Sequence, residues 1–324
     1  MTEGYLGVDV GSVSTNFVVI DSEGEVLFSK YMRTRGEPIK AVQQGLKETE
    51  KNLGDDIQIC GVGTTGSARV LTGVIVGADT VKNEITAHAV AASHQVPEVQ
   101  TVLEIGGQDS KIIILRQGIV VDFAMNTVCA AGTGSFIDHQ ASRLGVPIEE
   151  FGDLALESKN PVRIAGRCSV FAESDMIHKQ QMGHENKDIV KGLCQALVRN
   201  YLNNVGKGKE ILGPVVFQGG VAANKGIHHA FEEALEQNVN IPDNFDVMGA
   251  IGAALLAQDT VKESEETKFR GFEAGDIQYD ASSFECDECP NICEIVNIEA
   301  EGSLLARWGG RCGKWENIKD QAVV

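Results

Sequence analysis

Short apolar runs separated by glycine turns recur in the first half of the chain. Residues 5–10 (YLGVDV) form one run, a Gly-Ser turn follows, and residues 16–20 (NFVVI) form a second run. Residues 102–105 (VLEI) and 111–115 (KIIIL) repeat this arrangement around the loop GGQDS. Runs of this length with small turn residues between them are typical of β-hairpins. Two matching hairpins about 100 residues apart favour a duplicated α/β domain over a short-period solenoid.

Apolar positions at helical spacing predict helices between and after the hairpins. The expected helices cover residues 38–53, 80–93, 135–144, 172–182, 187–205 and 247–256. Short strands are expected at residues 57–66, where a turn follows, and at residues 215–218. The last helix contains mainly small apolar residues (MGAIGAA), which is typical of a helix packed closely against neighbouring backbone.

These elements divide the chain into four parts. Residues 1–98, together with helix 247–258, are expected to form one domain, and residues 99–246 a second domain of the same type. Residues 259–275 are charged and poorly periodic, as expected for a linker. Residues 276–324 are expected to form a separate small unit, because half of the eight cysteines fall in it.

Composition and charge narrow the class of protein. With 324 residues, 43% hydrophobic and 23% charged, the chain has ordinary soluble composition and room for two domains of about 150 residues. No run reaches the roughly 20 apolar residues of a membrane span, and no charged and apolar leader precedes the first strand, so a cytoplasmic location is expected. A net charge of -18 argues against binding nucleic-acid phosphates. Eight cysteines without a secretory signal indicate reduced thiols for metal or redox chemistry.

The tip of the first hairpin has the composition of a phosphate-binding turn. Backbone N–H groups that bind a nucleotide triphosphate must approach it closely, which favours glycine and small hydroxyl residues. The tip supplies such residues as Gly11, Ser12, Ser14 and Thr15. Asp9, at the end of the preceding strand, is placed to hold Mg2+ through water. Any hairpin with a glycine turn has a similar tip, so this motif alone does not establish nucleotide binding.

Two further turns strengthen the nucleotide prediction. The second hairpin tip contains Gly106, Gly107, Gln108 and Asp109, and either of the last two could orient an attacking water. A third turn follows the expected strand 215–218 and leads into a helix, as a turn below a nucleoside would. This turn contains Gly219, Gly220, Val221 and Asn224. The alternative for this third turn is a connection that serves the fold alone. The sequence has no Walker lysine motif, which excludes a P-loop enzyme.

Cys129 and Cys168 each precede an expected helix. A helix N-terminus favours the thiolate form of cysteine, so both residues are suited to bind metal. A four-iron cluster normally takes four thiolates, and a twofold dimer would supply the missing pair. The alternative is that both are ordinary structural cysteines.

A second group of thiols lies in the C-terminal unit. Cys286, Cys289 and Cys293 are separated by two and three residues, and Cys312 follows in the glycine-rich run GGRCG. A short chelating turn with a later glycine-flanked cysteine predicts a metal site. Zinc and a second iron-sulfur cluster both remain open, because four thiolates suit either. The alternative is four free thiols.

The two hairpins and the late Gly-Gly turn resemble the sugar kinase, Hsp70 and actin superfamily. This resemblance implies actin-like (ribonuclease H-like) ATPase domains with ATP in the cleft between them. The runs CAAGTGSF, GRCSVFAESD, EIGGQDSK and GGVAANK further resemble the activator, or archerase, family. That family includes the activators of 2-hydroxyacyl-CoA dehydratases and the ATPase subunits of benzoyl-CoA reductase. The resemblance covers about residues 4–258.

The family resemblance implies a function. It implies a homodimer with one [4Fe-4S] cluster held at the interface by Cys129 and Cys168 of both subunits. Gly132 and Thr133, in the first cysteine run, are counted among the expected cofactor-binding residues. Two ATP molecules with Mg2+ would drive a hinge motion that lowers the cluster potential. The chain would then be a low-potential electron donor.

The partners implied are iron-sulfur proteins. The acceptor would be a 2-hydroxyacyl-CoA dehydratase, a benzoyl-CoA reductase-like protein or a double-cubane cluster protein, and ferredoxin or flavodoxin the electron source. The cysteine-rich tail departs from the short activators and leaves the acceptor open. Two other functions remain as alternatives: a sugar or amino-sugar kinase of the same superfamily, and a nucleotide-sensing regulatory protein.

Overall fold

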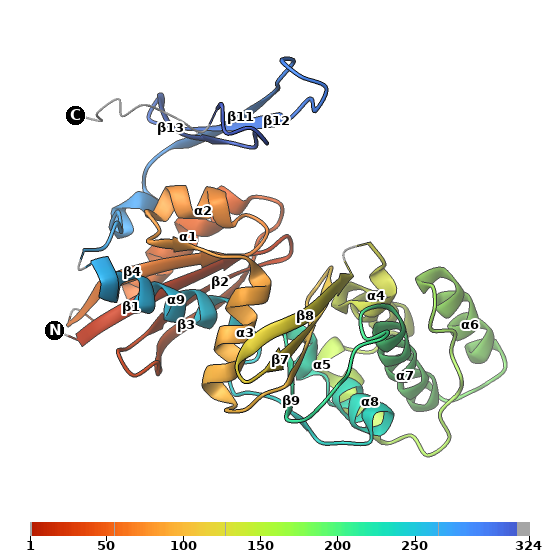
Figure 1. Cartoon of the computed structure of the whole chain (residues 1–324). Helices are drawn as coiled ribbons and strands as arrows, with labels where there is room; N and C mark the ends of the chain where they lie inside the picture. The colour runs from red at the N-terminus through yellow and green to blue at the C-terminus, as the bar shows by residue number, and fades with distance from the viewer. Residues whose placement is uncertain (1, 55, 127, 265, 316–324) are drawn as a thin grey trace.

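The protein contains two five-stranded sheets and a smaller three-stranded sheet (Figure 1). These are seen in a computed structural model that describes residues 2–54, 56–126, 128–264 and 266–315. In the described residues no helix is both long enough and apolar enough to cross a bilayer.

The first sheet is built on the first hairpin. Its strand order is β3-β2-β1-β4-β5, in which β1 to β3 are antiparallel neighbours and β1, β4 and β5 run parallel. The strands are β1 (Thr2–Val10), β2 (Ser14–Ile20), β3 (Val26–Arg33), β4 (Ile57–Thr65) and β5 (Thr80–Val81). Helices α1 (Pro38–Asn52) and α2 (Arg69–Val76) share an apolar core with one of its faces.

The second sheet repeats this topology. Its order is β10-β9-β6-β7-β8, with β6 to β8 antiparallel neighbours and β6, β9 and β10 parallel. The strands are β6 (Thr101–Ile105), β7 (Ser110–Arg116), β8 (Ile119–Asn126), β9 (Val215–Gln218) and β10 (Val239–Asn240). Its outer helices are α4 (Gly134–Leu144), α5 (Ile148–Leu156), α6 (Ser169–Gln181), α7 (Asn186–Asn204) and α8 (Lys225–Leu235). The prediction of a duplicated α/β fold is therefore confirmed.

Two helices lie between the sheets. Helices α3 (Glu84–Gln95) and α9 (Met248–Ser264) share one apolar core with residues of both sheets, including Val18 and Val102. Helix α9 lies directly on β1 and β4. A Cβ atom on Gly7 would lie 1.8 Å from the Ala250 carbonyl oxygen, so only glycine permits this approach.

Some predicted elements differ from the structure. The helix expected at residues 80–93 is wrong at its start, because Thr80–Val81 adds a strand to the first sheet. Helix α3 begins later, at Glu84, where the Asn83 side chain caps it by accepting a bond from Thr86 N–H. Residues 259–264, expected in a linker, instead continue α9, and Val261 in this stretch packs into the core between the sheets. The elements that the sequence pattern did not predict include β3, α2, β8, α5, β10 and the three C-terminal strands.

The C-terminal unit is an antiparallel sheet of β11 (Tyr279–Glu285), β12 (Glu294–Ala300) and β13 (Ser303–Trp308). It follows the short 3-10 helix η3 (Phe272–Gly275), which packs on α1. Tyr279 and Ile298 are buried in the core shared by α1, α2 and the first sheet. In Figure 1 this sheet lies beyond α1 and α2, on the opposite side of the molecule from α6.

Candidate functional site

A cavity of about 410 Å³ lies between the two sheets, where the hairpin tips face each other. It is also lined by the start of α4, the turn between β9 and α8, and the start of α9. The structure brings twelve predicted site residues to this cavity: Asp9, Gly11, Ser12, Ser14, Gly106, Gly107, Gln108, Asp109, Gly219, Gly220, Val221 and Asn224. Segments far apart in the sequence thus meet around one space.

Three residues expected to bind the cofactor do not line the cavity. Thr15 is buried behind the first tip, where its hydroxyl pairs with that of Thr34 at 2.9 Å. Gly132 and Thr133 belong to the turn before α4, and the Thr133 hydroxyl donates to the Ala130 carbonyl at 2.8 Å. Thr15 and Thr133 bond to neighbouring protein groups, and none of the three residues is among those that line the cavity.

The two hairpin tips have the same backbone turn. Gly11 N–H donates to the Ser14 carbonyl at 2.8 Å, and Gly106 N–H donates to the Asp109 carbonyl at 3.1 Å. The tips also approach each other closely, since a Cβ atom on Gly107 would lie 2.9 Å from methyl groups of Val13. A ligand between the tips can therefore be held by backbone of both halves.

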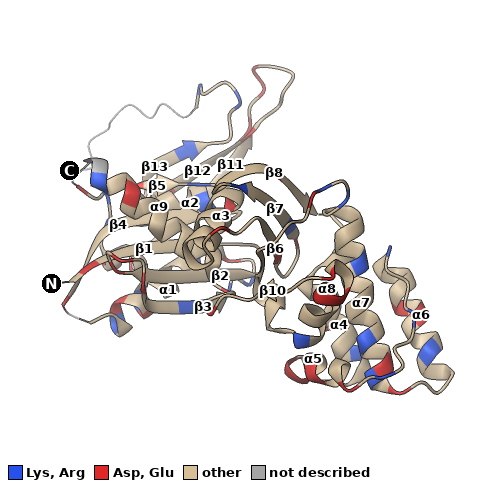
Figure 2. Ribbon diagram, turned by 60° about the horizontal axis from the view of Figure 1, so that its bottom comes forward, with Lys and Arg blue, Asp and Glu red and all other residues tan. Residues whose placement is uncertain are grey.

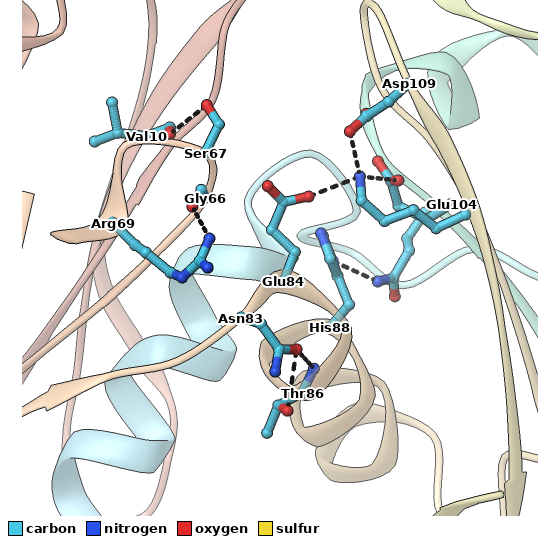
Figure 3. Close-up of polar contacts among 12 residues, drawn as sticks. Val10, Gly66, Ser67, Arg69, Asn83, Glu84, Thr86, His88, Glu104 and Asp109 are labelled. Carbon is cyan, nitrogen blue, oxygen red and sulfur yellow. Dashed lines mark hydrogen bonds and ion pairs between the residues drawn. The ribbon is translucent and has the colours of Figure 1, made fainter. Parts of the chain in front are cut away.

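A buried lysine organises the acidic side of the cavity (Figure 3). Lys111 Nζ forms ion pairs with Glu84 at 2.9 Å, Glu104 at 3.0 Å and Asp109 at 2.9 Å. Burial alone would lower the pKa of Lys111, but the three carboxylates outweigh it and raise the pKa above its ordinary value. Glu84 comes from α3, so this cluster joins the interdomain helix to the second hairpin.

Sequence reasoning missed the roles of Lys111, Glu84 and Glu104. One signal was present, because Glu104 and Lys111 occupy paired positions across the second hairpin and interrupt apolar runs. Burial raises the pKa of Glu104 to about 8, against the opposing effect of Lys111. For Glu84, burial would also raise the pKa, but the adjacent Lys111 charge lowers it overall.

Asp9 lies at the cavity without a cation partner. It forms no ion pair with a described residue, and burial together with the Glu84 charge raises its pKa to about 7. Two glycines make room for its carboxylate: a Cβ atom on Gly249 would lie 2.2 Å from Oδ2, and one on Gly66 would lie 2.5 Å from Oδ1. A carboxylate so placed suits a divalent cation.

His88 on α3 borders the same cavity. Its Nδ1 lies 2.8 Å from Nε2 of Gln218, a strand β9 residue. Burial, with the Lys111 charge, lowers the pKa of His88 to about 4. The ring is therefore neutral near neutral pH, and the Gln218 amide can donate to it.

Cys129 and Cys168 lie at the start of helical segments at one end of the second domain. Cys168 directly precedes α6, whereas a 3-10 turn, η1 (Ala130–Gly132), separates Cys129 from α4. Asn126 holds both sides of Cys129, since it donates to the Cys129 carbonyl and accepts from its N–H at 2.8 and 3.0 Å. Both thiols are partly exposed.

One buried amide connects the two cysteine loops. Asn200 on α7 donates to the Gly166 carbonyl at 2.7 Å, two residues before Cys168. Its Oδ1 lies 2.8 Å from the position of a Cβ atom on Gly132, three residues after Cys129. Asn200 therefore packs against both loops and fixes their relative position.

Exposed apolar side chains surround these loops. Val128 is 94% exposed, and Val170 and Phe171, directly after Cys168, are 65% and 67% exposed. Further exposed apolar residues follow one face of the edge strand β8: Ile119, Val121, Phe123 and Met125. Apolar surface of this extent is typical of a protein contact.

The remaining cysteines differ in environment. Cys194 is buried, and burial raises its pKa to about 12, as expected of a core thiol. Cys286 is buried, Cys293 is partly exposed, and Cys289 and Cys312 are exposed. Among the residues that the structure describes, no three His, Cys, Asp or Glu side chains are close enough together to hold a metal ion.

Figure 2 shows Lys and Arg interspersed with Asp and Glu over the helices of the second domain. The full sequence has 28 Lys and Arg against 46 Asp and Glu, which gives a net charge of -18.

Comparisons with known proteins agree with this geometry. The (R)-2-hydroxyglutaryl-CoA dehydratase activating ATPase of Acidaminococcus fermentans is 33% identical over 257 residues, which cover 78% of this chain and 96% of that protein. A structure of the activator of the 2-hydroxyisocaproyl-CoA dehydratase from Clostridium difficile with bound ADPNP matches with a TM-score of 0.71 and 32% identity, over 81% of this chain and 97% of that chain.

A more distant structure bears on the fold alone. A ROK family glucokinase from Streptomyces griseus, in complex with glucose and AMPPNP, matches with a TM-score of 0.50 at 12% identity, over 79% of this chain and 99% of that chain. The predicted actin-like ATPase fold is thus confirmed. The sequence model of the BadF/BadG/BcrA/BcrD ATPase family matches residues 6–257 of this chain. Residues 258–324 lie outside the match. The chain belongs to the BadF/BadG/BcrA/BcrD ATPase family.

Proposed function

We propose that this chain is an ATPase that drives one-electron transfer to an iron-sulfur partner protein. The observation that carries the proposal is a direct contact between the second hairpin tip and the start of α4. The N–H groups of the first two α4 residues donate to the carbonyls of Gly106 and Gly107, at N···O distances of 2.9 Å. A displacement of the tip is thereby passed to α4 and to the loop that carries Cys129.

The cavity residues fit ATP with Mg2+. Gly11 and Gly106 start equivalent turns on opposite sides of the cavity, and Asp9 has no cation partner among the described residues. Asn16 Oδ1, on a residue that lines the cavity, is buried without a hydrogen-bond partner in the described structure. When bound, ATP would supply the phosphoanhydride bond, and Asp9 would hold Mg2+ through water.

The two candidates for positioning the attacking water differ in their contacts. Asp109 is engaged in an ion pair with Lys111, whereas Gln108 is exposed at the tip and lines the cavity. An engaged carboxylate is less free to turn toward a water molecule than an exposed amide. We therefore assign water positioning to Gln108, and the fixing of the tip to Asp109.

The thiols fit a cluster shared between two copies of the chain. Each copy offers two partly exposed thiols, Cys129 and Cys168, and a four-iron cluster takes four. A twofold axis beside the loops would join the pairs and cover the apolar residues Val128, Val170 and Phe171. The cluster would supply one-electron redox chemistry.

The partner class follows from the relatives. The similar proteins named above are a dehydratase-activating ATPase and a dehydratase activator. By extension, a 2-hydroxyacyl-CoA dehydratase is the first candidate for the acceptor of this chain. A benzoyl-CoA reductase-like protein and a double-cubane cluster protein, which the sequence resemblance also implies, are the other candidates. Ferredoxin or flavodoxin would supply the electron.

Anaerobic purification tests the proposal. The wild-type chain should contain about four iron and four sulfide per dimer, and Cys168→Ser should lose most of both. Dithionite-reduced protein should then reduce a candidate acceptor only when ATP is present. Cys60→Ser is the matched control, because Cys60 is partly exposed on β4, outside the cysteine loops.

An iron-free dimer that hydrolyses ATP would contradict the electron-transfer proposal. That result would favour the two alternative functions, a sugar or amino-sugar kinase and a nucleotide-sensing regulatory protein. Transfer to the acceptor at equal rates with and without ATP would contradict the coupling alone.

A further inference from the structure

The C-terminal sheet has little apolar core where β11 connects to β12. Ile295 is buried near this end, and Phe284 packs edge-on against Trp315 with ring centroids 5.1 Å apart. Beyond these residues, the connection at residues 287–292 is exposed throughout. Small units with so little core commonly depend on a metal or a disulfide for stability.

Two cysteines occupy opposed positions across this end of the sheet. Cys286 and Cys293 lie one step beyond the last β11–β12 pair, Glu285 with Glu294. Cys286 N–H donates to the Cys293 carbonyl at 2.8 Å, which extends the ladder to these residues. Residues paired across antiparallel strands lie about 5 Å apart, a separation from which two thiolates can reach one ion. Cys289 belongs to the intervening turn.

A second loop carries Cys312 to the same end. Trp315 Nε1 donates a hydrogen bond to Cys286 Sγ at 3.3 Å, and Lys314 forms an ion pair with Glu288 in the turn. Gly309, with a φ of 109°, folds this loop so closely onto β12 that a Cβ atom there would lie 2.2 Å from the Glu294 carbonyl oxygen. Both loops are therefore tied together beside the Cys286 thiol.

We infer that Cys286, Cys289, Cys293 and Cys312 form a tetrathiolate site for one zinc ion. The Trp315 N–H would stabilise the Cys286 thiolate, as donors to sulfur do around metal centres. Cys289 and Cys312, which are exposed, would turn inward when the ion binds at Zn–S distances of about 2.3 Å. Each thiol that binds would release its proton to solvent.

A single ion suits this end better than an iron-sulfur cluster. Cys286 and Cys293 are held at ladder spacing by a backbone hydrogen bond, and a four-iron cluster would hold its thiolates farther apart than one ion does. Zinc also needs no protection from solvent, which reaches Cys289 and Cys312 here. The site lies outside the family match at residues 6–257, so this inference does not rest on the proposed function.

Metal analysis of the full chain tests the inference. We would use a Cys129→Ser background to separate the tail from the proposed cluster. The protein should carry about one zinc per chain, and Co2+ added to the chelator-stripped protein should give the intense visible absorption of tetrahedral tetrathiolate cobalt. Cys286→Ser and Cys312→Ser should each reduce the amount of zinc bound per chain by at least about 10-fold. Cys60→Ser should leave it unchanged.

Three results would overturn the inference. The first is a stripped protein that binds neither Zn2+ nor Co2+ and has all four tail thiols reactive. The second is retention of iron with sulfide in the Cys129→Ser background, which would make the site a cluster. The third is zinc that persists in both tail variants, which would place the ion elsewhere.

Discussion

At the residue scale, the feature that most constrains the cavity is the charge balance around Lys111. Its side chain is 3% exposed, and its ammonium group pairs with carboxylates from α3, β6 and the second hairpin tip. Glu104 and Asp109 belong to the same hairpin as Lys111, whereas Glu84 comes from α3, so only the folded chain brings Glu84 to this lysine. Removing the cation would leave several carboxylates close together in a poorly solvated space.

We expect Lys111→Met to destabilise the protein by about 3 to 5 kcal/mol, because it leaves buried carboxylates unpaired. Urea unfolding followed by circular dichroism measures this loss. The matched control is Lys40→Met, whose lysine pairs with Glu37 at the surface and should change stability by less than about 1 kcal/mol. Equal effects of the two changes would contradict the role assigned to Lys111.

His88 should make the stability of the folded protein fall as the pH is lowered. Burial lowers the pKa of His88 from 6.5 to about 4 in the folded state, so below about pH 6.5 the unfolded chain binds a proton that the folded chain does not. Its contribution to stability is full above that pH and is lost as the pH falls toward 4. The loss between about pH 7 and pH 5 is on the order of 2 kcal/mol.

Unfolding of His88→Gln at these two pH values checks this expectation. The variant should lose less stability than the wild type on acidification, because the titrating ring is absent. His184→Gln is the control, since His184 is exposed. A wild-type acid loss that His88→Gln leaves unchanged would show that other groups cause it.

At the element scale, local patterns predicted the hairpins but not every helix boundary. Glycine turns between apolar runs are local features, so both hairpins and strand β9 were found where the structure has them. The predicted start of helix α3 was too early, because the apolar spacing continues through Thr80–Val81. Only the Asn83 cap marks the true beginning of the helix. Strand β8 was not predicted, although its sequence is mostly apolar, and in the structure the apolar residues on one of its faces are exposed.

The sequence predicted only those parts of the candidate site that are formed by local motifs. Residues at the hairpin tips, such as Gly11 and Gly106, line the cavity because the tips themselves are local motifs. Glu84 and His88 reach it from α3, and no local pattern links that helix to the hairpins. Gly132 was expected to bind a cofactor, but it does not line the cavity, and the turn it belongs to packs against Asn200.

The packing of α9 on the first sheet gives an element-scale prediction. Gly7→Ala would place a methyl group 1.8 Å from the Ala250 carbonyl oxygen, so α9 must shift and the protein should lose about 3 kcal/mol or more. Thermal or urea unfolding measures the change. Gly220→Ala is the control, because its added methyl group meets no atom within 4 Å and should cost less than about 1 kcal/mol. Similar losses in both variants would contradict close packing at Gly7.

At the scale of the whole molecule, two similar halves are joined through α3 and α9, which lie between their sheets. The cavity opens between the halves, and the cysteine loops lie at the outer end of the second half. Under the proposed function, a nucleotide that draws the hairpin tips together would move loops that it does not touch.

The apolar surface at those loops predicts self-association. Phe171→Asp, which places a charge beside Cys168, should weaken the dimer at least about 10-fold and reduce its iron content, while leaving ADP binding unchanged. Anaerobic analytical ultracentrifugation and isothermal titration calorimetry measure the two properties. Leu27→Asp is the control, because Leu27 is 40% exposed on β3 in the other half. A Phe171→Asp protein that dimerises normally would place the interface elsewhere.

The attachment of the C-terminal sheet affects how the chain could be shortened. Segment η3 and residues Tyr279 and Ile298 cover apolar side chains of α1, including Leu46. A chain cut after residue 264, near the end of the family match, would leave this hydrophobic face of the first half in water. Such a truncated protein would tend to aggregate even with an intact nucleotide cavity, so loss of activity on truncation would not by itself indicate a catalytic role for the tail.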